Sequence, residues 1–312
     1  MGKAYRRDRE VKSEKNKGTR GRILTQDRLV GMGGNLILIL FLLIIVIPVG
    51  YILLCSIMDP AVRSSVGVSL DVKDWTLEGY RRVFQDDNIW RGFRNSIFYS
   101  VAFTAISVIV TLFAAYPMSR DDFMGRKLFN AVFVFTMFFG GGLMPTYLLM
   151  DQLKLINTVW AVLLPGAVNV WNLILARSYY KSVPSELSEA AEMDGATDIQ
   201  YFFRVLLPVC MPIISVLCLY QFVAQWNSYF DAMIYLDNQN MQPLQLVIRA
   251  ILVQNQINPN LVANMEKLAE TARLADLLKY STIVISSVPL ILMYPFFSKY
   301  FEKGIMIGAV KG

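Results

Sequence analysis

Long apolar runs constrain this chain more than any other feature. Six of them are long enough to cross a bilayer as helices, which takes about 20 apolar residues. They cover residues 35–58, 95–118, 128–150, 158–177, 208–230 and 281–301. Gly140 to Gly142 in the third run and Pro165 with Gly166 in the fourth predict breaks in those helices. The sequence therefore predicts an all-α membrane protein with six transmembrane helices, which agrees with its 55% hydrophobic content.

The charges beside these runs predict an orientation. The net charge is +6, and the first 32 residues hold ten basic and four acidic side chains, so the rest of the chain is balanced. A basic segment directly before an apolar run is typical of a cytoplasmic anchor, and nucleic-acid binding is not expected. Residues 1–32 are therefore predicted to be a cytoplasmic tail, and residues 33–312 the transmembrane domain. Basic residues after the second, fourth and last runs then place both termini in the cytoplasm and residues 231–280 in a long outer loop.

The mostly polar residues 182–208, between the fourth and fifth runs, predict a helix, a turn and a second helix. Pro184 suits the first position of a helix. Gly195 is expected to end that helix, because glycine takes a left-handed conformation without a steric penalty. Thr197 and Gln200 form the capping-box pattern that starts a second helix, which we expect to run to Pro208.

The first of these two helices has a small face, Ala190 and Ala191, which indicates that another surface packs against it. The segment resembles the EAA loop of ABC importer permeases, in which EAA is followed after three residues by Gly and, nine residues later, by I-x-L-P. Only Val205 departs from this pattern, since isoleucine is usual there. The resemblance implies that residues 182–208, the EAA segment, dock on a cytoplasmic ATPase through Glu189, Ala190, Ala191, Asp194, Gly195 and Pro208. An ordinary amphipathic connector is the alternative.

Amides and tryptophans are the polar side chains that stand out inside the apolar runs. We call them the pathway set: Asn169, Trp171, Asn172, Gln221, Gln225, Trp226 and Asn227. Amides bond to hydroxyls in pairs and an indole offers a flat face to a sugar ring, so the set predicts a carbohydrate pathway. Amides also bond between packed membrane helices, and this alternative stays open for each residue.

Several kinds of chemistry are missing from the chain. No acidic residue lies inside the six runs, whereas ion- and proton-coupled carriers keep ionisable groups at mid-membrane. The chain has neither a G-x-x-x-x-G-K-[ST] phosphate loop nor a histidine. Its three cysteines lie in or beside apolar runs without metal or disulfide spacing. We expect no enzyme activity, no metal and no cofactor on this chain, so a partner must supply the energy for uphill transport.

Four further stretches extend the resemblance over nearly all of the chain after residue 30. They are FGGGLMPTYLL (139–149), LINTVWAVLLPGAVNVWNLILARSYY (155–180), QWNSYFDAMIYL (225–236) and KYFEKGIMIGAVKG (299–312). These resemble MalG-like, more narrowly LplC- and YtcP-like, permeases of carbohydrate ABC importers, whose transmembrane domain is of the type I (MetI-like) kind.

The resemblance implies the following assembly in a bacterial cell membrane. The chain forms a heterodimer with a second permease, above two ATPase subunits that bind ATP and below an extracytoplasmic solute-binding protein. The substrate is an oligosaccharide, with acidic and pectin-derived sugars typical of this branch. Arg177 and Arg249 are the candidate cations for an acidic sugar.

Two other classes of protein remain open from the sequence. An ABC permease for a non-sugar solute, such as a peptide or an amino acid, shares the EAA loop, so the carbohydrate prediction depends on the resemblance outside it. A channel-like or structural membrane protein needs no ATPase, and a docking loop then has no role.

Overall fold

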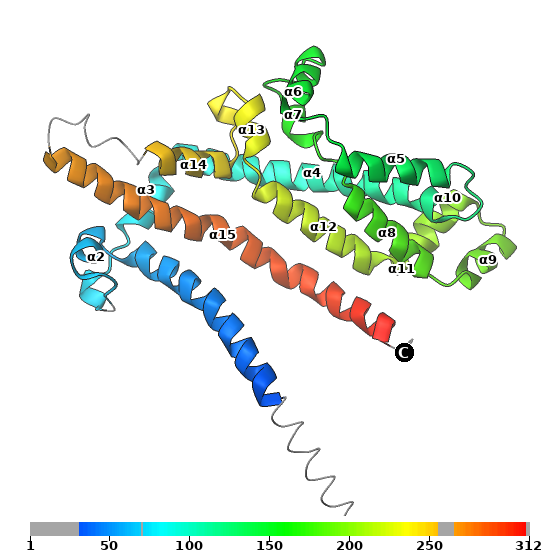
Figure 1. Cartoon of the computed structure of the whole chain (residues 1–312), viewed down its shortest axis with the longest axis horizontal. Coiled ribbons are helices and arrows are strands. Elements are labelled where there is room, and N and C mark those ends of the chain that lie inside the picture. The colour runs from blue at the N-terminus through cyan, green and yellow to red at the C-terminus, as the bar shows by residue number, and fades with distance from the viewer. Residues whose placement is uncertain (1–30, 70, 255–264, 310–312) are drawn as a thin grey trace, which may run out of the picture.

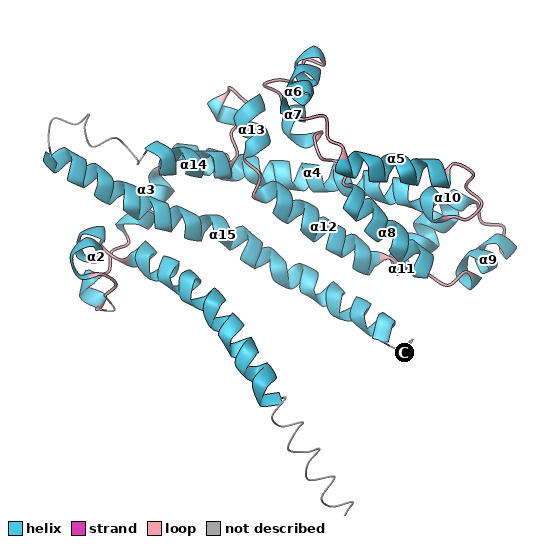
Figure 2. Cartoon of the chain, viewed as in Figure 1, coloured by secondary structure: helices cyan, strands magenta, loops and turns pink. Residues whose placement is uncertain are grey.

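The computed structural model describes residues 31–69, 71–254 and 265–309. Within these ranges the protein is helical, with one isolated β-bridge between Met58 and Trp75 (Figure 2). The predicted basic tail lies outside the described residues, apart from its last two positions. The all-α prediction is confirmed for the part that the structure describes.

The helices differ greatly in length, from single turns to 45 residues. In chain order they are the N-terminal helix Gly31–Ile57, α2 (Pro60–Val66), η1 (Val72–Asp74), α3 (Glu78–Gln85), α4 (Asp87–Ser119), α5 (Arg126–Phe138), α6 (Leu143–Gln152), α7 (Trp160–Leu163), α8 (Val170–Ser182), α9 (Glu186–Met193), α10 (Asp198–Tyr201), the π-helical turn η2 (Phe202–Leu206), α11 (Leu207–Val209), α12 (Met211–Trp226), α13 (Phe230–Tyr235), η3 (Gln239–Met241), α14 (Leu244–Gln254) and α15 (Met265–Ala309).

Three of the described helices are long and apolar enough to cross a membrane unbroken. They are Gly31–Ile57, α4, and Ala275–Phe297 within α15. Two bent pairs also pass if each counts as one span: α5 with α6, bent by 113°, and Asp198–Val209 with α12, bent by 78°. The described helices therefore give three to five candidate spans, where the sequence predicts six.

Glycine and proline account for the breaks. α5 ends just before Gly140, and Gly142, at φ +84°, precedes α6. The fourth apolar run is interrupted between α7 and α8 at Pro165 and Gly166, the latter at φ +74°. Both breaks were predicted. Because unwound backbone is tolerated at membrane depth only where protein or a water-filled cavity surrounds it, these positions are expected to face the interior of an assembly.

The long helix α4 is the centre of the packing. It contacts α8, α12 and α14, and α12 in turn contacts α15. Small buried residues on α4, among them Ser100, Ser107 and Ala115, allow these helices to approach closely. Figure 1 shows α4, α12 and α15 running along the long axis of the molecule, with α9 at one end and α2, α3 and α14 toward the other.

The predicted long outer loop is helical over much of its length. It contains α13, η3, α14 and the start of α15, and α14 packs against both α4 and α15. Two side chains of α4 bind its backbone. Asn95 Nδ2 donates to the carbonyls of Asn240 (2.8 Å) and Gln242 (3.0 Å), and Leu244 N–H donates to Ser96 Oγ (2.8 Å). The amide-rich residues 255–264 lie outside the described residues.

Candidate functional site

A tight turn follows α9 in the EAA segment. Gly195 N–H donates to the carbonyl of Glu192 (3.0 Å) and Ala196 N–H to that of Ala191 (2.9 Å), the two bonds of a Schellman motif. Gly195 has φ +74°, the left-handed conformation that the motif needs. The predicted role of Gly195 as the helix-ending residue is confirmed.

The predicted second helix starts directly after this turn. The Thr197 side chain accepts from Gln200 N–H (3.3 Å), and Gln200 Oε1 accepts from Thr197 N–H (3.0 Å), so the capping box is present. The helical chain continues through α10, η2 and α11, which contains Pro208. α9 itself begins at Glu186, two residues after Pro184. The helix, turn and helix of the EAA segment match the prediction, with an added π-helical turn, but the prediction that the first helix starts at Pro184 was wrong by two residues.

α9 has two different faces. Ala191 is its buried residue and packs into an apolar cluster with Ala115 of α4 and Ala176 of α8. The other residues predicted to couple to an ATPase are exposed, and Met193 beside them is 89% exposed. They are Glu189, Ala190, Asp194, Gly195 and Pro208. One face of α9 is therefore fixed to this chain and the other is free for a partner.

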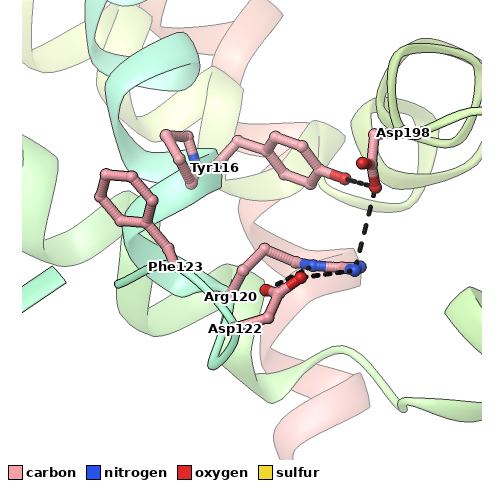
Figure 3. A pocket seen from close by; sticks show the side chains of 6 residues that line it. Tyr116, Arg120, Asp122, Phe123 and Asp198 are labelled. Atoms are coloured by element: carbon pink, nitrogen blue, oxygen red, sulfur yellow. Dashed lines mark hydrogen bonds and ion pairs between the residues drawn. The ribbon is translucent and has the colours of Figure 1, made fainter. Parts of the chain in front are cut away.

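A polar network holds the fixed face of α9. Arg120, directly after α4, donates from Nη1 to Ser188 Oγ on α9 (3.1 Å). Its Nη2 lies 3.6 Å from Glu192 Oε1 on α9 and 3.8 Å from Asp198 Oδ1 on α10. Tyr116 of α4 donates to the same Asp198 oxygen (3.3 Å), as Figure 3 shows. In the sequence, Arg120 was only one of the basic residues that follow the second apolar run. No spacing in the chain indicates these distant partners.

The loop after α4 is charge-paired on both sides of Arg120. Arg120 donates to both carboxyl oxygens of Asp122, at 3.3 and 3.5 Å, and this holds the pKa of Asp122 below its ordinary value. Arg126 and Lys181 pair with Asp121 and lower the pKa of that carboxyl too. Two cavities of about 260 and 360 Å³ lie against Arg120. These pairs tie the loop to α5 and α8.

The members of the pathway set on and before α8 have different surroundings. The Asn169 side chain accepts from Asn172 N–H (3.0 Å) and so caps the start of α8. Asn172 is buried, whereas Trp171 is 60% exposed. Asn169 thus has a structural role at the start of the helix that carries Trp171.

The members on α12 divide in the same way. Gln221 is buried and donates to Ser107 Oγ of α4, and Trp226 is buried and donates from Nε1 to the carbonyl of Ser286 on α15 (3.1 Å). Gln225 is half-buried, and the exposed Asn227 donates to the carbonyl of Val223 (2.8 Å). Gln221 and Trp226 therefore join helices.

α8 and α12 contact each other, but the two halves of the pathway set stay separate. Among the described side chains, no hydrogen bond or ring contact joins the members at α8 to those on α12. The members with accessible surface and no bond to another helix are Asn169, Trp171, Gln225 and Asn227.

The two candidate cations for an acidic sugar differ in position. Arg249 of α14 lies 5.4 Å from the centre of the Tyr229 ring, and its Nη1 contacts Met233 Sδ. Arg177 of α8 donates to Asn130 Oδ1 of α5 (2.7 Å), while its Nε is buried without a partner. Neither pairs with an acidic side chain in the described ranges, so each guanidinium keeps a positive charge that no carboxylate neutralises.

Residues 93–307 match the family described as binding-protein-dependent transport system inner membrane component. The chain belongs to this family, and it is a multi-pass permease, not an enzyme.

Sugar-transport permeases are among its similar proteins. The polygalacturonan/rhamnogalacturonan transport system permease protein YtcP of Bacillus subtilis (strain 168) is 33% identical over 88% of this chain and 96% of its own length. Protein LplC of the same organism is 34% identical over 86% of this chain and 90% of its own. A chain in the crystal structure of a bacterial ABC transporter involved in the import of the acidic polysaccharide alginate superposes with a TM-score of 0.78. It is 31% identical in sequence, and the match covers 88% of this chain and 98% of that one. The resemblance to LplC- and YtcP-like permeases and the type I importer fold are confirmed.

Proposed function

We propose that this chain is the transmembrane permease subunit of an ATP-driven, binding-protein-dependent importer of oligosaccharides. The observation that carries the proposal is the likeness to sugar-transport permeases over 86 to 88% of the chain, together with the free face of α9. In this assembly the chain forms half of the pathway with a second permease. Two ATPase subunits bind below it, and an extracytoplasmic binding protein delivers the sugar.

The EAA segment is the ATPase-docking element of this proposal. Its exposed residues Glu189, Ala190 and Asp194 would enter the ATPase interface, while Ala191 stays in this chain's core. Gly195 and Pro208 would set the directions of the two helices. When ATP closes the ATPase dimer, α9 moves with it, and the broken helices switch the cavity from inward to outward access. A switch between 1:99 and 99:1 needs about 5.5 kcal/mol of differential binding, so the docking must be firm.

The proposed topology has six spans in a bacterial cell membrane, with both termini in the cytoplasm. The three unbroken helices, α5 with α6, α7 with α8, and α12 would be the spans. Figure 1 supports the orientation, because α9 and the C-terminal part of α15 lie toward the same end of the long axis. α2, α3 and α14 would then face the binding protein.

The accessible members of the pathway set would contact the sugar. Trp171 offers an exposed indole face, and Gln225 and Asn227 lie two residues apart at the C-terminal end of α12, where Asn227 is the C-cap. The buried members, among them Gln221 and Trp226, would hold the helices that form the pathway.

The substrate is proposed to be an acidic oligosaccharide. Polygalacturonan and alginate, which name the similar transporters, carry a carboxylate on each uronic acid unit. A guanidinium binds a carboxylate in a bidentate fashion, and neither Arg249 nor Arg177 has an acidic partner among the described residues. Arg249 lies over the ring of Tyr229, which is two residues after Asn227, so a cation, an aromatic face and an amide occur together.

One experiment tests the assembly and the substrate in turn. The tagged chain is isolated from its native membranes in mild detergent, and co-purifying proteins are identified by mass spectrometry. We expect an ATPase and a second permease. The complex is then reconstituted with its binding protein, and uptake of a labelled oligogalacturonate is compared with uptake of its methyl ester.

Each result has a clear consequence. ATP-dependent uptake of the acid in preference to the ester, reduced in Arg249→Gln, supports the proposal. A chain that purifies alone, as a channel would, contradicts it. Uptake of a peptide but of no sugar contradicts the choice of substrate.

A further inference from the structure

Arg120 lies where three parts of the chain meet. It follows the last residue of α4, and its side chain is 28% exposed. Its guanidinium reaches α9 through Ser188 and Glu192 and α10 through Asp198. Figure 3 shows the guanidinium with Asp122 on one side and Asp198 on the other.

Arg120 is the counter-charge of three carboxylates. Glu192 and Asp198 have no other cation within 4 Å among the described residues, and Asp122 pairs with Arg120 alone there. Removing the guanidinium leaves three carboxylates facing one another with no counter-charge. Their repulsion, reduced by solvent because these side chains are 62 to 73% exposed, would loosen the contact of α9 with the end of α4.

The other contacts of α9 are weak by comparison. Ala191 is the single buried residue of this eight-residue helix, and a methyl group buries little area. The hydroxyl of Tyr116 adds one bond from α4 to Asp198 at 3.3 Å. Arg120 is therefore the main polar connection between α4 and both helices of the EAA segment.

We propose that Arg120 is a positioning residue that transmits the movement of α9 to α4. This inference rests on the proposed function, because it takes α9 as the place where the ATPase acts. α4 contacts α8, α12 and α14, so a displacement of its cytoplasmic end reaches the helices that carry the pathway set. Arg120 itself touches neither ATP nor sugar.

The test measures sugar imported per ATP hydrolysed by the reconstituted complete transporter. Arg120→Ala is expected to lower this ratio at least tenfold while the complex assembles in normal yield and basal ATP hydrolysis remains. Arg120→Lys keeps the positive charge but loses the several donors of the planar guanidinium. Its ratio is therefore expected to lie between those of the wild type and Arg120→Ala. Arg82→Ala is the matched control, because Arg82 makes an ion pair with Glu78 on α3, far along the chain from the EAA segment. Its ratio is expected to equal that of the wild type.

A second variant decides the matter if Arg120→Ala fails to assemble. The double variant Glu192→Gln with Asp198→Asn keeps Arg120 and its pair with Asp122 but removes both carboxylates beyond the loop. A lower ratio in this variant supports the inference, and a wild-type ratio overturns it. A wild-type ratio in Arg120→Ala overturns it equally.

The wild-type complex separates the two levels of failure. If it shows no ATP-dependent sugar uptake, the proposed function fails and the inference falls with it. If it imports sugar normally and both sets of variants do the same, only the role of Arg120 is overturned.

Discussion

The EAA segment and the pathway set use polar residues in opposite ways. In the EAA segment the backbone is fixed by Gly195 and the Thr197 capping box, and Glu189, Ala190 and Asp194 beside them are exposed. In the pathway set the backbone is mostly ordinary helix, and the polar groups of Gln221 and Trp226 donate hydrogen bonds to neighbouring helices. A motif defined by backbone geometry thus leaves several of its side chains exposed. Isolated amides in apolar helices first satisfy packing, because an unpaired polar group is costly there.

Gly195→Val would test the fixed backbone of the EAA segment, and we expect the largest effect from it. A β-branched residue in the left-handed conformation costs roughly 1–2 kcal/mol, so the turn rearranges and α9 is misdirected. Uptake should fall at least tenfold while membrane insertion and basal ATP hydrolysis remain. Gly67→Val is the matched control, since Gly67 also has a positive φ, +87°, and also has open space around it. Normal uptake by Gly195→Val would refute the proposal that the movement of α9 drives transport.

Gln221→Ala would test the packing role within the pathway set. The change leaves the buried Ser107 hydroxyl without its donor, which costs about 1–3 kcal/mol of folding free energy. We expect a lower midpoint of thermal unfolding in detergent, with Gln225→Ala unchanged as the control. If Gln221→Ala unfolds at the wild-type temperature, the bond to Ser107 does not hold α12 against α4.

Gln225→Ala would test the sugar-binding role of the accessible members of the pathway set. Losing one hydrogen bond to the sugar, worth about 1 kcal/mol, is expected to lower uptake roughly fivefold at limiting sugar. Basal ATP hydrolysis should stay intact, because Gln225 is remote from the EAA segment along α12. Equal losses of uptake and hydrolysis would show that Gln225 also serves packing.

Asp231→Asn should have the smallest effect, and it depends on pH. Asp231 lies in α13, outside the spans, and burial raises the pKa of its carboxyl above the ordinary 3.8. The folded protein therefore holds that proton more tightly than the unfolded chain, and stability is lost as the pH rises above about 3.8. Asp231→Asn should raise the unfolding midpoint at pH 7 and give no gain at pH 3.5. The exposed Asp237→Asn is the control, and an equal change at both pH values would exclude this origin.

The sequence predicts the EAA segment well because its signals are local. Gly195, Thr197 and Gln200 act on their own neighbours in the chain, so their geometry follows from residue type and spacing. The breaks at Gly142 and Gly166 were predictable for the same reason.

Contacts between residues far apart in the chain could not be predicted from the sequence. Arg120 meets Ser188 and Asp198 across the fold, and no spacing in the chain indicates those pairs. Which amides are buried depends equally on which helix lies opposite, so Gln221 and Gln225 look alike in the sequence and differ in the structure. α14 was missed because a short amphipathic helix beside many amides resembles a solvated loop.

The central claim is that the free face of α9 binds an ATPase subunit, and cross-linking tests it most directly. The three cysteines are replaced by alanine, and Met193→Cys is introduced at the exposed end of α9. Native membranes are treated with a short thiol-to-amine cross-linker. We predict an adduct that contains this chain and an ATPase subunit, absent when the cysteine is placed instead at Val72, an exposed residue near α2 and α3. Cross-linking to the ATPase from position 72 but not from position 193 would contradict the account.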